Sequence, residues 1–292
     1  MNARRWTSLV AALAILCATG WTYVNQVSTG ANMTRAANQF LKTLYASQRE
    51  TVLLDYDSPA RVDWHFIPKD TRKGLQIRYM VEPQRDAALK LLRSCLSEVG
   101  YGKAEQIMEL ESILYALEGS GGSNIRDSQR YYISMFGQPT EQGRWGLSIE
   151  GHHLSLNFVI DAGQVISSTP SFFAANPAIV KNEVDGGLPV GTQVLKNEEE
   201  LAFRLVKSLN DTQLSKALLA DTAPREIRGP VGAQAPPDES VGITYGELDD
   251  DQRKIMKNLV TSYLDNLPDD VRKLRLEALP ACRAPASSSV GA

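Results

Sequence analysis

The sequence predicts an α+β fold in which a central antiparallel sheet is flanked by helical hairpins. Apolar and polar residues alternate in the middle of the chain, where residues 144–150 and 152–160 form two adjacent strand patterns. Apolar residues recur at helical spacing on both sides of this region, over residues 89–96 and 201–209. An antiparallel sheet covered by helices is the simplest arrangement that buries both patterns.

The composition, net charge and cysteine count exclude several classes of protein. The 292 residues carry a net charge of -3, with 43% hydrophobic and 22% charged residues, which is typical of a globular protein. No basic stripe is present, so we expect no nucleic-acid partner. The cysteines Cys17, Cys95 and Cys282 lack metal-type spacing, and their number excludes a disulfide framework.

The N-terminus has the layout of an export signal. Arg4 and Arg5 precede the apolar run Leu9–Ala18, and small or polar residues follow from Thr19. We therefore interpret residues 1–30 as a signal peptide or an N-terminal anchor. Either interpretation predicts an extracytoplasmic protein, secreted or periplasmic, that touches the membrane only if this segment stays uncleaved.

The remaining chain is predicted to be a single α+β domain over residues 31–279. A helix is expected over residues 32–54, followed by a strand at 61–66, in which Val62, Trp64 and Phe66 alternate with polar residues. Residues 280–292 lack core-forming side chains and are expected to be a disordered tail.

Two helices are predicted next, as a helical hairpin. The first opens at Glu82-Pro83 and ends at Gly100 as its C-cap, and the second covers residues 103–117. Ser120–Ser123 is interpreted as the loop that follows them.

The central sheet is predicted from strands at 131–136, 144–150 and 152–160, with a turn at 161–163 leading to Val165-Ile166. Gly151 is expected to be a tight turn or a bulge between two of these strands. Residues 169–177 have no periodicity and are interpreted as a long loop of the kind that lines sites.

The C-terminal part is predicted to be helical. Helix starts are indicated at Asn197, Asn210 and Asp249, each followed three residues later by Glu or Gln. The last of these helices and the one that opens at Pro268 are expected to form a second helical hairpin. Between the helix that starts at Asn210 and the one that starts at Asp249, residues 224–242 are rich in Pro and Gly and predict a long loop.

The adjacent His152 and His153 are the first candidates for chemistry. On a strand their side chains would point to opposite faces. His152 then shares a face with apolar residues, which leaves a hydrogen-bonded core histidine or a ligand as its interpretations. His153 shares a polar face with Ser155 and Asn157, which is either solvated or the floor of a cleft.

His65 would join His153 in one site if the strand at 61–66 paired with the central sheet. Two imidazoles with a carboxylate from Glu150, Asp63 or Glu111 would suffice to hold a divalent metal, although no HExxH spacing is present. Arg126 either binds an anion or pairs with Asp127 at a strand entrance.

Five stretches of the chain also carry a family resemblance. In order, they are RVDWHFIP, LLRSCLSEVGYGKAEQIMELESILYALE, RDSQRYYISMFGQP, WGLSIEGHHLSLNF and STPSFFAANPA. Over roughly residues 40–267 the chain resembles the domain-of-unknown-function family numbered thirty-five hundred. This resemblance implies an exported bacterial protein and brings no activity, substrate or cofactor.

The resemblance has one departure. The family continues past its last helices into a segment rich in His, Tyr and Asn, with two closely spaced histidines, whereas here Leu279-Pro280 leads into a low-complexity tail. If the family's site is a metal centre built from both halves, we expect this chain to be a truncated, inactive or differently used member.

Two functional hypotheses follow. The first is an extracytoplasmic enzyme with metal-assisted hydrolytic or oxidative chemistry. In it His153, His65 and His152 are metal ligands, Glu150 is the acid or base, and Arg126 holds an anion. The second is a non-catalytic binding or structural module that holds an unknown small molecule or peptide on the polar sheet face and the 171–176 loop.

Overall fold

The computed structural model describes residues 27–119, 125–222 and 241–279. The export signal or anchor expected at the N-terminus lies almost entirely outside these residues, as do the loop at 120–123, most of the loop at 224–242 and the tail at 280–292. Helix α2 begins at Thr29, two residues inside the segment interpreted as the signal, and the Thr29 amide donates to Asp270 Oδ2 at 2.8 Å.

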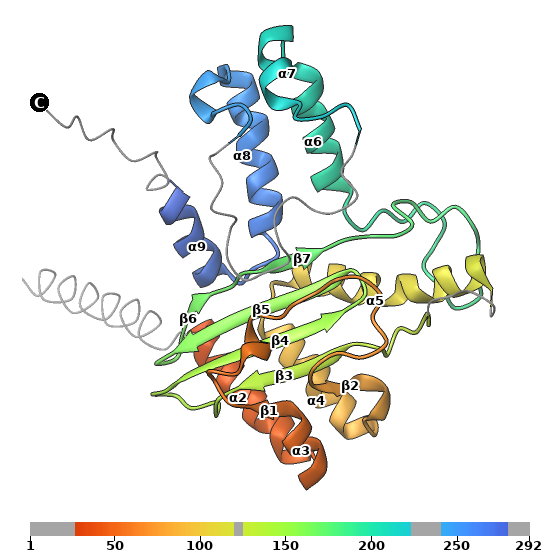
Figure 1. Ribbon diagram of the computed structural model, residues 1–292, viewed down its shortest axis with the longest axis vertical. Helices are drawn as coiled ribbons and strands as arrows, with labels where there is room; N and C mark the ends of the chain where they lie inside the picture. The colour runs from red at the N-terminus through yellow and green to blue at the C-terminus, as the bar shows by residue number, and fades with distance from the viewer. Residues whose placement is uncertain (1–26, 120–124, 223–240, 280–292) are drawn as a thin grey trace, which may run out of the picture.

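A seven-stranded sheet forms the centre of the molecule (Figure 1). Its strands are β1 Leu53–Leu54, β2 Leu75–Gln76, β3 Tyr132–Phe136, β4 Arg144–Gly151, β5 Leu154–Asp161, β6 Gln164–Ser167 and β7 Ser171–Phe173. The main path runs β1-β3-β4-β5-β6, while β2 also pairs with β3 and β7 with β5. All pairings are antiparallel except that of β1, which follows helix α3 directly and runs parallel to β3.

Eight α-helices surround the sheet within the described residues. They are α2 Thr29–Thr43, α3 Ala46–Val52, α4 Glu82–Ser94, α5 Glu98–Glu118, α6 Lys196–Ser208, α7 Asp211–Ala217, α8 Asp250–Leu264 and α9 Asp269–Ala278. Short 3-10 helices are η1 Pro59–Arg61, η2 Ile77–Tyr79 and η3 Tyr245–Glu247. The predicted α+β class is confirmed, with a mixed sheet in place of a purely antiparallel one.

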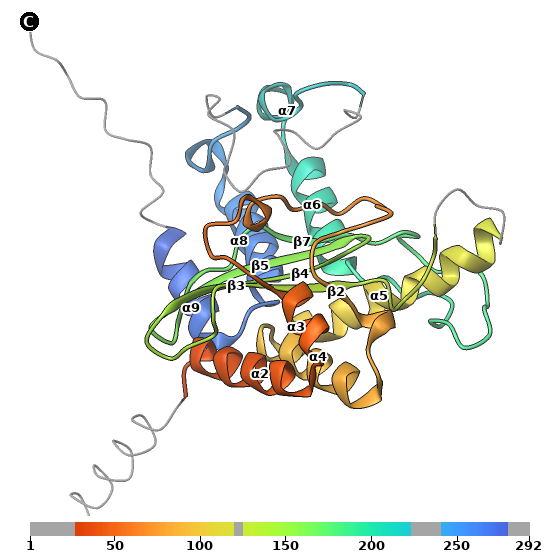
Figure 2. The ribbon, with the colours of Figure 1, turned by 60° about the horizontal axis from the view of Figure 1, so that its bottom comes forward.

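The main core lies between one face of the sheet and helices α2, α4 and α5, which lie together below it in Figure 2. Trp145, Leu147 and Ile149 on β4 are almost completely buried there. The indole of Trp145 donates to Thr34 Oγ1 on α2 at 3.2 Å. Burial of the alternating apolar side chains on this face therefore orients β4 and β5.

Two predicted helix boundaries are wrong. The single helix expected at 32–54 is two helices, because Leu44 and Tyr45 adopt extended backbone angles between α2 and α3. Gly100 is not a C-cap but lies in the first turn of α5, where the hydroxyl of Ser97 accepts from its amide. A Cβ on Gly100 would lie 2.2 Å from the Asn266 carbonyl oxygen, so the glycine allows close packing against the end of α8.

The predicted strand at 61–66 is also wrong. Beyond η1, residues 62–73 form an irregular segment across the second face of the sheet, which we call the strap (Figure 2). Its carbonyls bind side chains instead of a neighbouring strand: His65 O and Ile67 O accept from Arg72, and Asp63 O accepts from Lys73. The alternation of Trp64 and Phe66 reflects their packing near Phe172, onto which the Phe66 ring stacks at 4.1 Å.

The loop predicted at 169–177 contains a short strand. Residues 171–173 form β7 because their backbone pairs with residues 154–156 at the start of β5. This pairing brings β7 beside the turn that joins β4 to β5.

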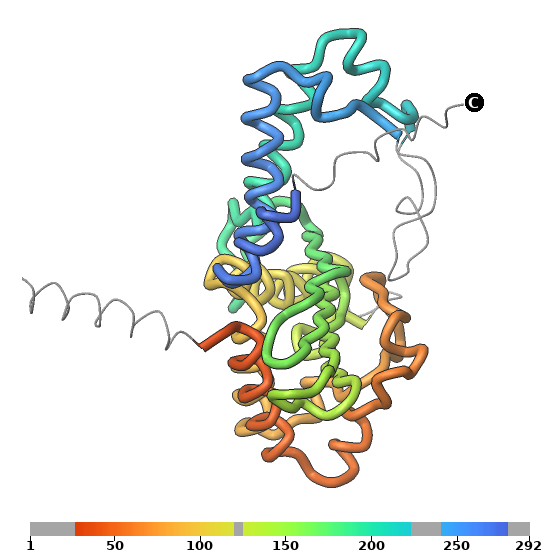
Figure 3. The backbone as a smooth tube through the Cα atoms, turned by 90° about the vertical axis from the view of Figure 1, so that its left-hand side faces the viewer, coloured from red at the N-terminus to blue at the C-terminus, as the bar shows by residue number. Residues whose placement is uncertain are grey.

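Helices α6 and α8 lie side by side and extend away from the sheet together with α7 (Figure 3). The capping boxes predicted at Asn210 and Asp249 are confirmed, since each side chain accepts from the amide three residues later. The expected pairing of α8 with α9 is corrected, because α8 packs mainly along α6 and meets α9 at one end.

Candidate functional site

His152 and His153 form the turn between β4 and β5. The last pair of the ladder is Gly151 with Leu154, which leaves the two histidines as the loop. Their rings are neighbours, with centroids 3.8 Å apart, so the predicted placement on opposite strand faces is wrong. His153 has a φ of 61°, a left-handed conformation that ends the strand at this position.

The backbone of the turn is hydrogen-bonded to the strap, to the residue after β7 and to a buried tyrosine. The His153 amide donates to Phe66 O in the strap, and the His153 carbonyl accepts from the Ala174 amide just after β7, both at 2.8 Å. The hydroxyl of the buried Tyr131 donates to His152 O at 2.9 Å. The backbone of both histidines is thereby fixed by three separate segments.

Helix α5 supplies the main partner of His152. The Glu111 carboxylate contacts the His152 Nδ1 atom; the side chain of Glu111 is buried and that of His152 is 10% exposed. Glu111 lies one turn after Ile107 and one turn before Leu114, and both of these apolar side chains are buried. Glu111 is expected from the sequence only as a carboxylate for a metal, although its place within an apolar helix stripe could have indicated a buried partner.

Arg126 lies between His152 and a second carboxylate, that of Glu118. Its Nη1 atom lies 3.2 Å from His152 Nδ1, and it donates twice to Glu118, at 2.8 and 2.7 Å. The hydrogen bond from Arg126 lowers the pKa of Glu118, and the same bond raises the pKa of Arg126. Arg126 is therefore already paired with a carboxylate, which differs from the predicted role of holding a free anion.

The contact with Glu111 also indicates a tautomer. Nδ1 of a neutral imidazole is either a donor or an acceptor, and a carboxylate can only accept. We assign the proton to Nδ1 because Glu111 is the closer of its two partners, so Arg126 Nη1, 3.2 Å away, is a neighbour of this atom and not its hydrogen-bond donor. In a neutral ring this tautomer leaves Nε2 as the acceptor. This is the arrangement in which a carboxylate orients a histidine for proton transfer.

A narrow polar pocket lies against these residues, with room for about one water molecule. It is lined by Pro68, Lys69, Arg72, Glu111, Ile125, Asp127, Arg130, Tyr131 and His152. The strap forms one wall of it, and α5, the segment before β3 and the histidine turn form the others. Arg72 and Arg130 were not anticipated from the sequence, since no local pattern distinguishes them from surface arginines.

Burial changes the acid–base properties of this region. It raises the pKa of Tyr131 well above its usual value and lowers the pKa of Arg72, against the attraction of Glu150. Burial, together with the neighbouring His152 and Arg126, lowers the pKa of His153 to about 4. His153 is therefore neutral at neutral pH.

Glu150 lies under the strap, among partners of its own. Its carboxylate accepts from Lys73 Nζ at 2.6 Å and Ser148 Oγ at 3.0 Å, and Arg72 Nη1 lies 3.8 Å away. Ser148 also donates to Asn157 Oδ1 at 3.0 Å. The polar sheet face is thus buried beneath the strap, and Glu150 has the surroundings of a structural ion-pair partner.

His65 lies in the strap. Its Nδ1 accepts from the amides of Phe66 and Ile67, at 3.0 and 3.2 Å. Within the described part of the chain, no three His, Cys, Asp or Glu side chains are grouped so that they could hold a metal ion. Of the predicted site residues, the structure brings together His152, His153 and Arg126, and places Glu150 and His65 in separate surroundings.

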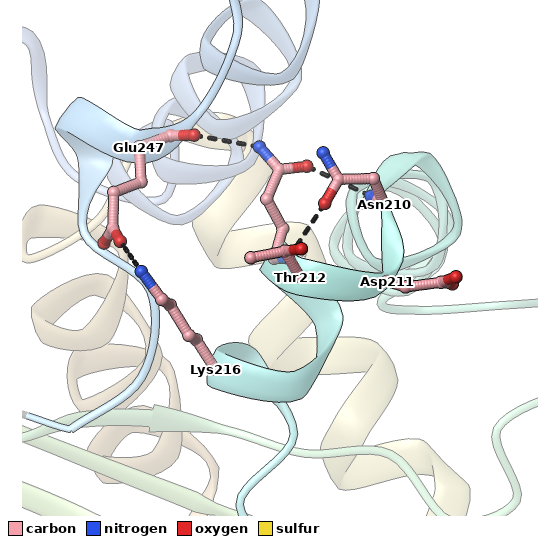
Figure 4. A pocket seen from close by; sticks show the side chains of 6 residues that line it. Asn210, Asp211, Thr212, Lys216 and Glu247 are labelled. Carbon is pink, nitrogen blue, oxygen red and sulfur yellow. Dashed lines mark hydrogen bonds and ion pairs between the residues drawn. The ribbon is translucent and has the colours of Figure 1, made fainter.

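A second, wider pocket lies between α7 and η3 (Figure 4). Its polar groups bind one another: Asn210 and Gln213 form a capping box, Gln213 donates to Glu247 O at 2.8 Å, and Lys216 pairs with the Glu247 carboxylate. These contacts join α7 to η3 and account for the polar residues there. We therefore place the candidate site at His152.

Comparison with known proteins identifies the family. The model of the family described as "Protein of unknown function (DUF3500)" matches residues 26–282. The chain belongs to this family. No curated protein and no solved structure matches the chain.

Membership in DUF3500 covers every element of the fold described above. The histidine turn, Glu111 and the strap all lie within the matched residues. None of the helices in the described residues of this DUF3500 chain is long and apolar enough to span a bilayer.

Proposed function

We propose that this chain is an extracytoplasmic enzyme in which Glu111 and His152 act as an acid–base pair on a ligand in the narrow pocket. The observation that carries the proposal is the contact between the Glu111 carboxylate and His152 Nδ1 at the wall of that pocket. The extracytoplasmic location rests on the export-signal pattern of residues 4–18.

The chemistry follows from the tautomer. With Nδ1 bonded to Glu111, the other ring nitrogen accepts a proton from water or from a substrate group, and Glu111 stabilises the imidazolium that forms. Hydrolysis is the reaction class that such a pair supports with water as the nucleophile. A positioned histidine contributes about 10²–10⁴-fold to the rate of such reactions.

The test is a panel of chromogenic carboxylic esters, phosphoric esters and amides, with wild type beside His152→Asn. We expect turnover that falls by about 10²-fold or more in His152→Asn. The matched control is His153→Asn at the adjacent position, because asparagine tolerates the left-handed backbone there. Turnover that is the same in His152→Asn and wild type would contradict the acid–base role.

A non-catalytic binding module is the second candidate. It is favoured by two pairs, Glu118 with Arg126 and Glu111 with His152, which tie α5 to the segment before β3 and to the histidine turn. This alternative predicts no turnover by the wild type on any member of the panel, together with saturable ligand binding at the pocket.

Metal assistance is a separate part of the sequence-based hypothesis, with His153 and His65 as ligands of a divalent ion. Elemental analysis of the purified chain tests it, with wild type beside His153→Ala. Near-stoichiometric metal that disappears in the variant supports a metal site at the turn, and metal-free wild type that turns over substrate contradicts one.

A further inference from the structure

The lining of the narrow pocket has an excess of positive charge. Three cationic side chains, Lys69, Arg72 and Arg130, face two carboxylates, Glu111 and Asp127. The difference is one positive charge. A charge excess in a small, partly desolvated pocket attracts an ion of opposite sign more strongly than it would in water.

The two carboxylates are already engaged. Glu111 contacts His152, and Asp127 Oδ2 lies 2.8 Å from Arg78 Nε. Arg78 Nε is not aligned to donate a hydrogen bond to this oxygen. Asp127 Oδ2 therefore has a charged neighbour but accepts no hydrogen bond. Neither carboxylate is placed chiefly to neutralise the arginines.

Arg130 is only weakly neutralised by the carboxylate next to it. Its side chain is largely buried, yet Asp70 Oδ1 lies 3.9 Å away on a fully exposed side chain. Such a pair contributes little, because water screens the exposed partner. The two hydrogen bonds of Arg130 Nη2 go to backbone carbonyls of the strap, Asp70 O at 2.6 Å and Lys69 O at 3.2 Å.

Arg72 is the second guanidinium of the pocket and is 3% exposed. Glu150 is 3.8 Å from it and is bound more closely by Lys73. Burial is the main cause of the lowered pKa of Arg72, and the positive charge of Arg130 contributes in the same direction. Two arginines that repel one another across a small pocket are stabilised by an anion that contacts both.

We propose that the narrow pocket binds a monocarboxylate, the group by which Arg72 and Arg130 hold the substrate beside His152. This inference rests on the proposed function, since it names the substrate class of the same site. The excess of one positive charge matches a single carboxylate, whereas a phosphate carries nearly two charges at neutral pH and would face Glu111 and Asp127. Both guanidinium groups already donate to strap carbonyls, so the carboxylate takes the N–H groups that these bonds leave.

The apolar part of the lining indicates what carries the carboxylate. Pro68 and Ile125 are apolar, and so is the ring of Tyr131. These side chains suit a short aliphatic carbon chain. A carboxylate is larger than the one water molecule for which the pocket has room, so its entry requires the wall formed by Pro68 and Lys69 of the strap to move.

The experiment measures binding without catalysis. The full purified chain is titrated with sodium propionate, sodium phosphate and sodium chloride at matched ionic strength, and the melting temperature and heat of binding are recorded. We expect saturable binding of propionate that raises the melting temperature. A larger saturable effect of phosphate, or an equal effect of all three salts, would overturn the monocarboxylate assignment.

Variants locate the binding. Arg130→Gln is expected to weaken propionate binding about tenfold or more, the usual effect of losing a charged hydrogen bond. Arg144→Gln is the matched control, because Arg144 pairs with Asp161 at the opposite end of β4 and should bind propionate like wild type. If Arg130→Gln does not fold, Lys69→Gln takes its place, since it removes a lining charge and leaves the strap carbonyls bonded. Unchanged propionate binding in the folded variant would overturn the proposal.

The two proposals fail differently. If propionate binds but turnover is the same in His152→Asn as in wild type, the acid–base role is overturned and the ligand class stands. Turnover that depends on His152 but is equally fast for esters with and without a free carboxylate overturns the ligand class and leaves the acid–base role standing.

Discussion

A Cβ atom on Gly151 would lie 2.1 Å from Cδ1 of the Tyr131 ring. The end of β4 therefore packs with its backbone directly against a buried aromatic ring, and the same tyrosine bonds the carbonyl of His152. The position of the histidine turn depends on this contact, because Gly151 with Leu154 is the last pair before it.

Gly151→Ala should destabilise the protein by about 1–3 kcal/mol, because the buried ring of Tyr131 has to move. Gly102→Ala is the matched control. Gly102 lies inside α5 with nothing within 4 Å of the added methyl group, so alanine should stabilise the chain by about 0.5–1 kcal/mol. Urea unfolding measures both, and a Gly151→Ala variant as stable as Gly102→Ala would contradict the packing described.

Stability should depend on pH through His153. Its pKa is about 4 in the folded chain, against an ordinary value of 6.5 for histidine, so the unfolded chain binds the proton more tightly between these values. This contribution to the free energy of unfolding is fully present above pH 6.5, declines as pH falls, and is gone below about pH 4. His153→Asn removes the titrating group and keeps a residue that tolerates a φ of 61°.

The measurement is the difference in the free energy of unfolding between wild type and His153→Asn from pH 7.5 to 4. It should change steadily from pH 6.5 to 4, while other groups cancel because both chains contain them. A difference that stays constant over this range would show that His153 is not buried as a neutral ring.

Glu111 and His152 should be energetically coupled. Glu111→Gln and His152→Asn should each lower the free energy of unfolding by about 1–3 kcal/mol, because each leaves a buried polar partner less well bonded. The double variant should lose less than the sum, with a coupling energy of about 0.5–3 kcal/mol. Strict additivity in urea unfolding would contradict direct contact between the two side chains.

Lys73 should matter for stability because it compensates a buried charge. Lys73→Met leaves the Glu150 carboxylate with Ser148 and the more distant Arg72, which should cost roughly 3 kcal/mol. The control is Lys196→Met, which breaks an exposed pair with Glu200 and should cost about 0.5 kcal/mol or less. Thermal unfolding that ranks the two variants equally would show that the strap does not bury Glu150.

Local patterns predicted the central strands well. The ranges expected at 131–136, 144–150 and 152–160 correspond to β3, β4 and β5, except that His152 and His153 form the turn before β5. Alternation is a reliable guide there because one face of each strand is buried against α2, α4 and α5, so a shift by one residue would expose the core. Helix starts with capping boxes, at Asn210 and Asp249, were predictable for a similarly local reason.

The strap shows why alternation alone is insufficient. Trp64 and Phe66 alternate with polar residues as they would in a strand, but a strand also needs a neighbour for its backbone. Here that need is met by the side chains of Arg72 and Lys73, which bind strap carbonyls. Those bonds depend on how the segment folds over the sheet, which its own residues do not encode.

Side-chain periodicity and capping within a few residues predict the α+β class, the central strands, most helix positions and the neighbourhood of the histidine pair. Only the folded chain shows that the histidines form a turn, that Glu150 lies paired beneath the strap, and that Glu111, Arg72 and Arg130 meet at His152. These residues are up to 80 positions apart in the chain, from Arg72 to His152. Contacts between residues so far apart in the chain depend on burial and charge pairing in the folded protein. The residues next to each of them in the sequence say little about these contacts.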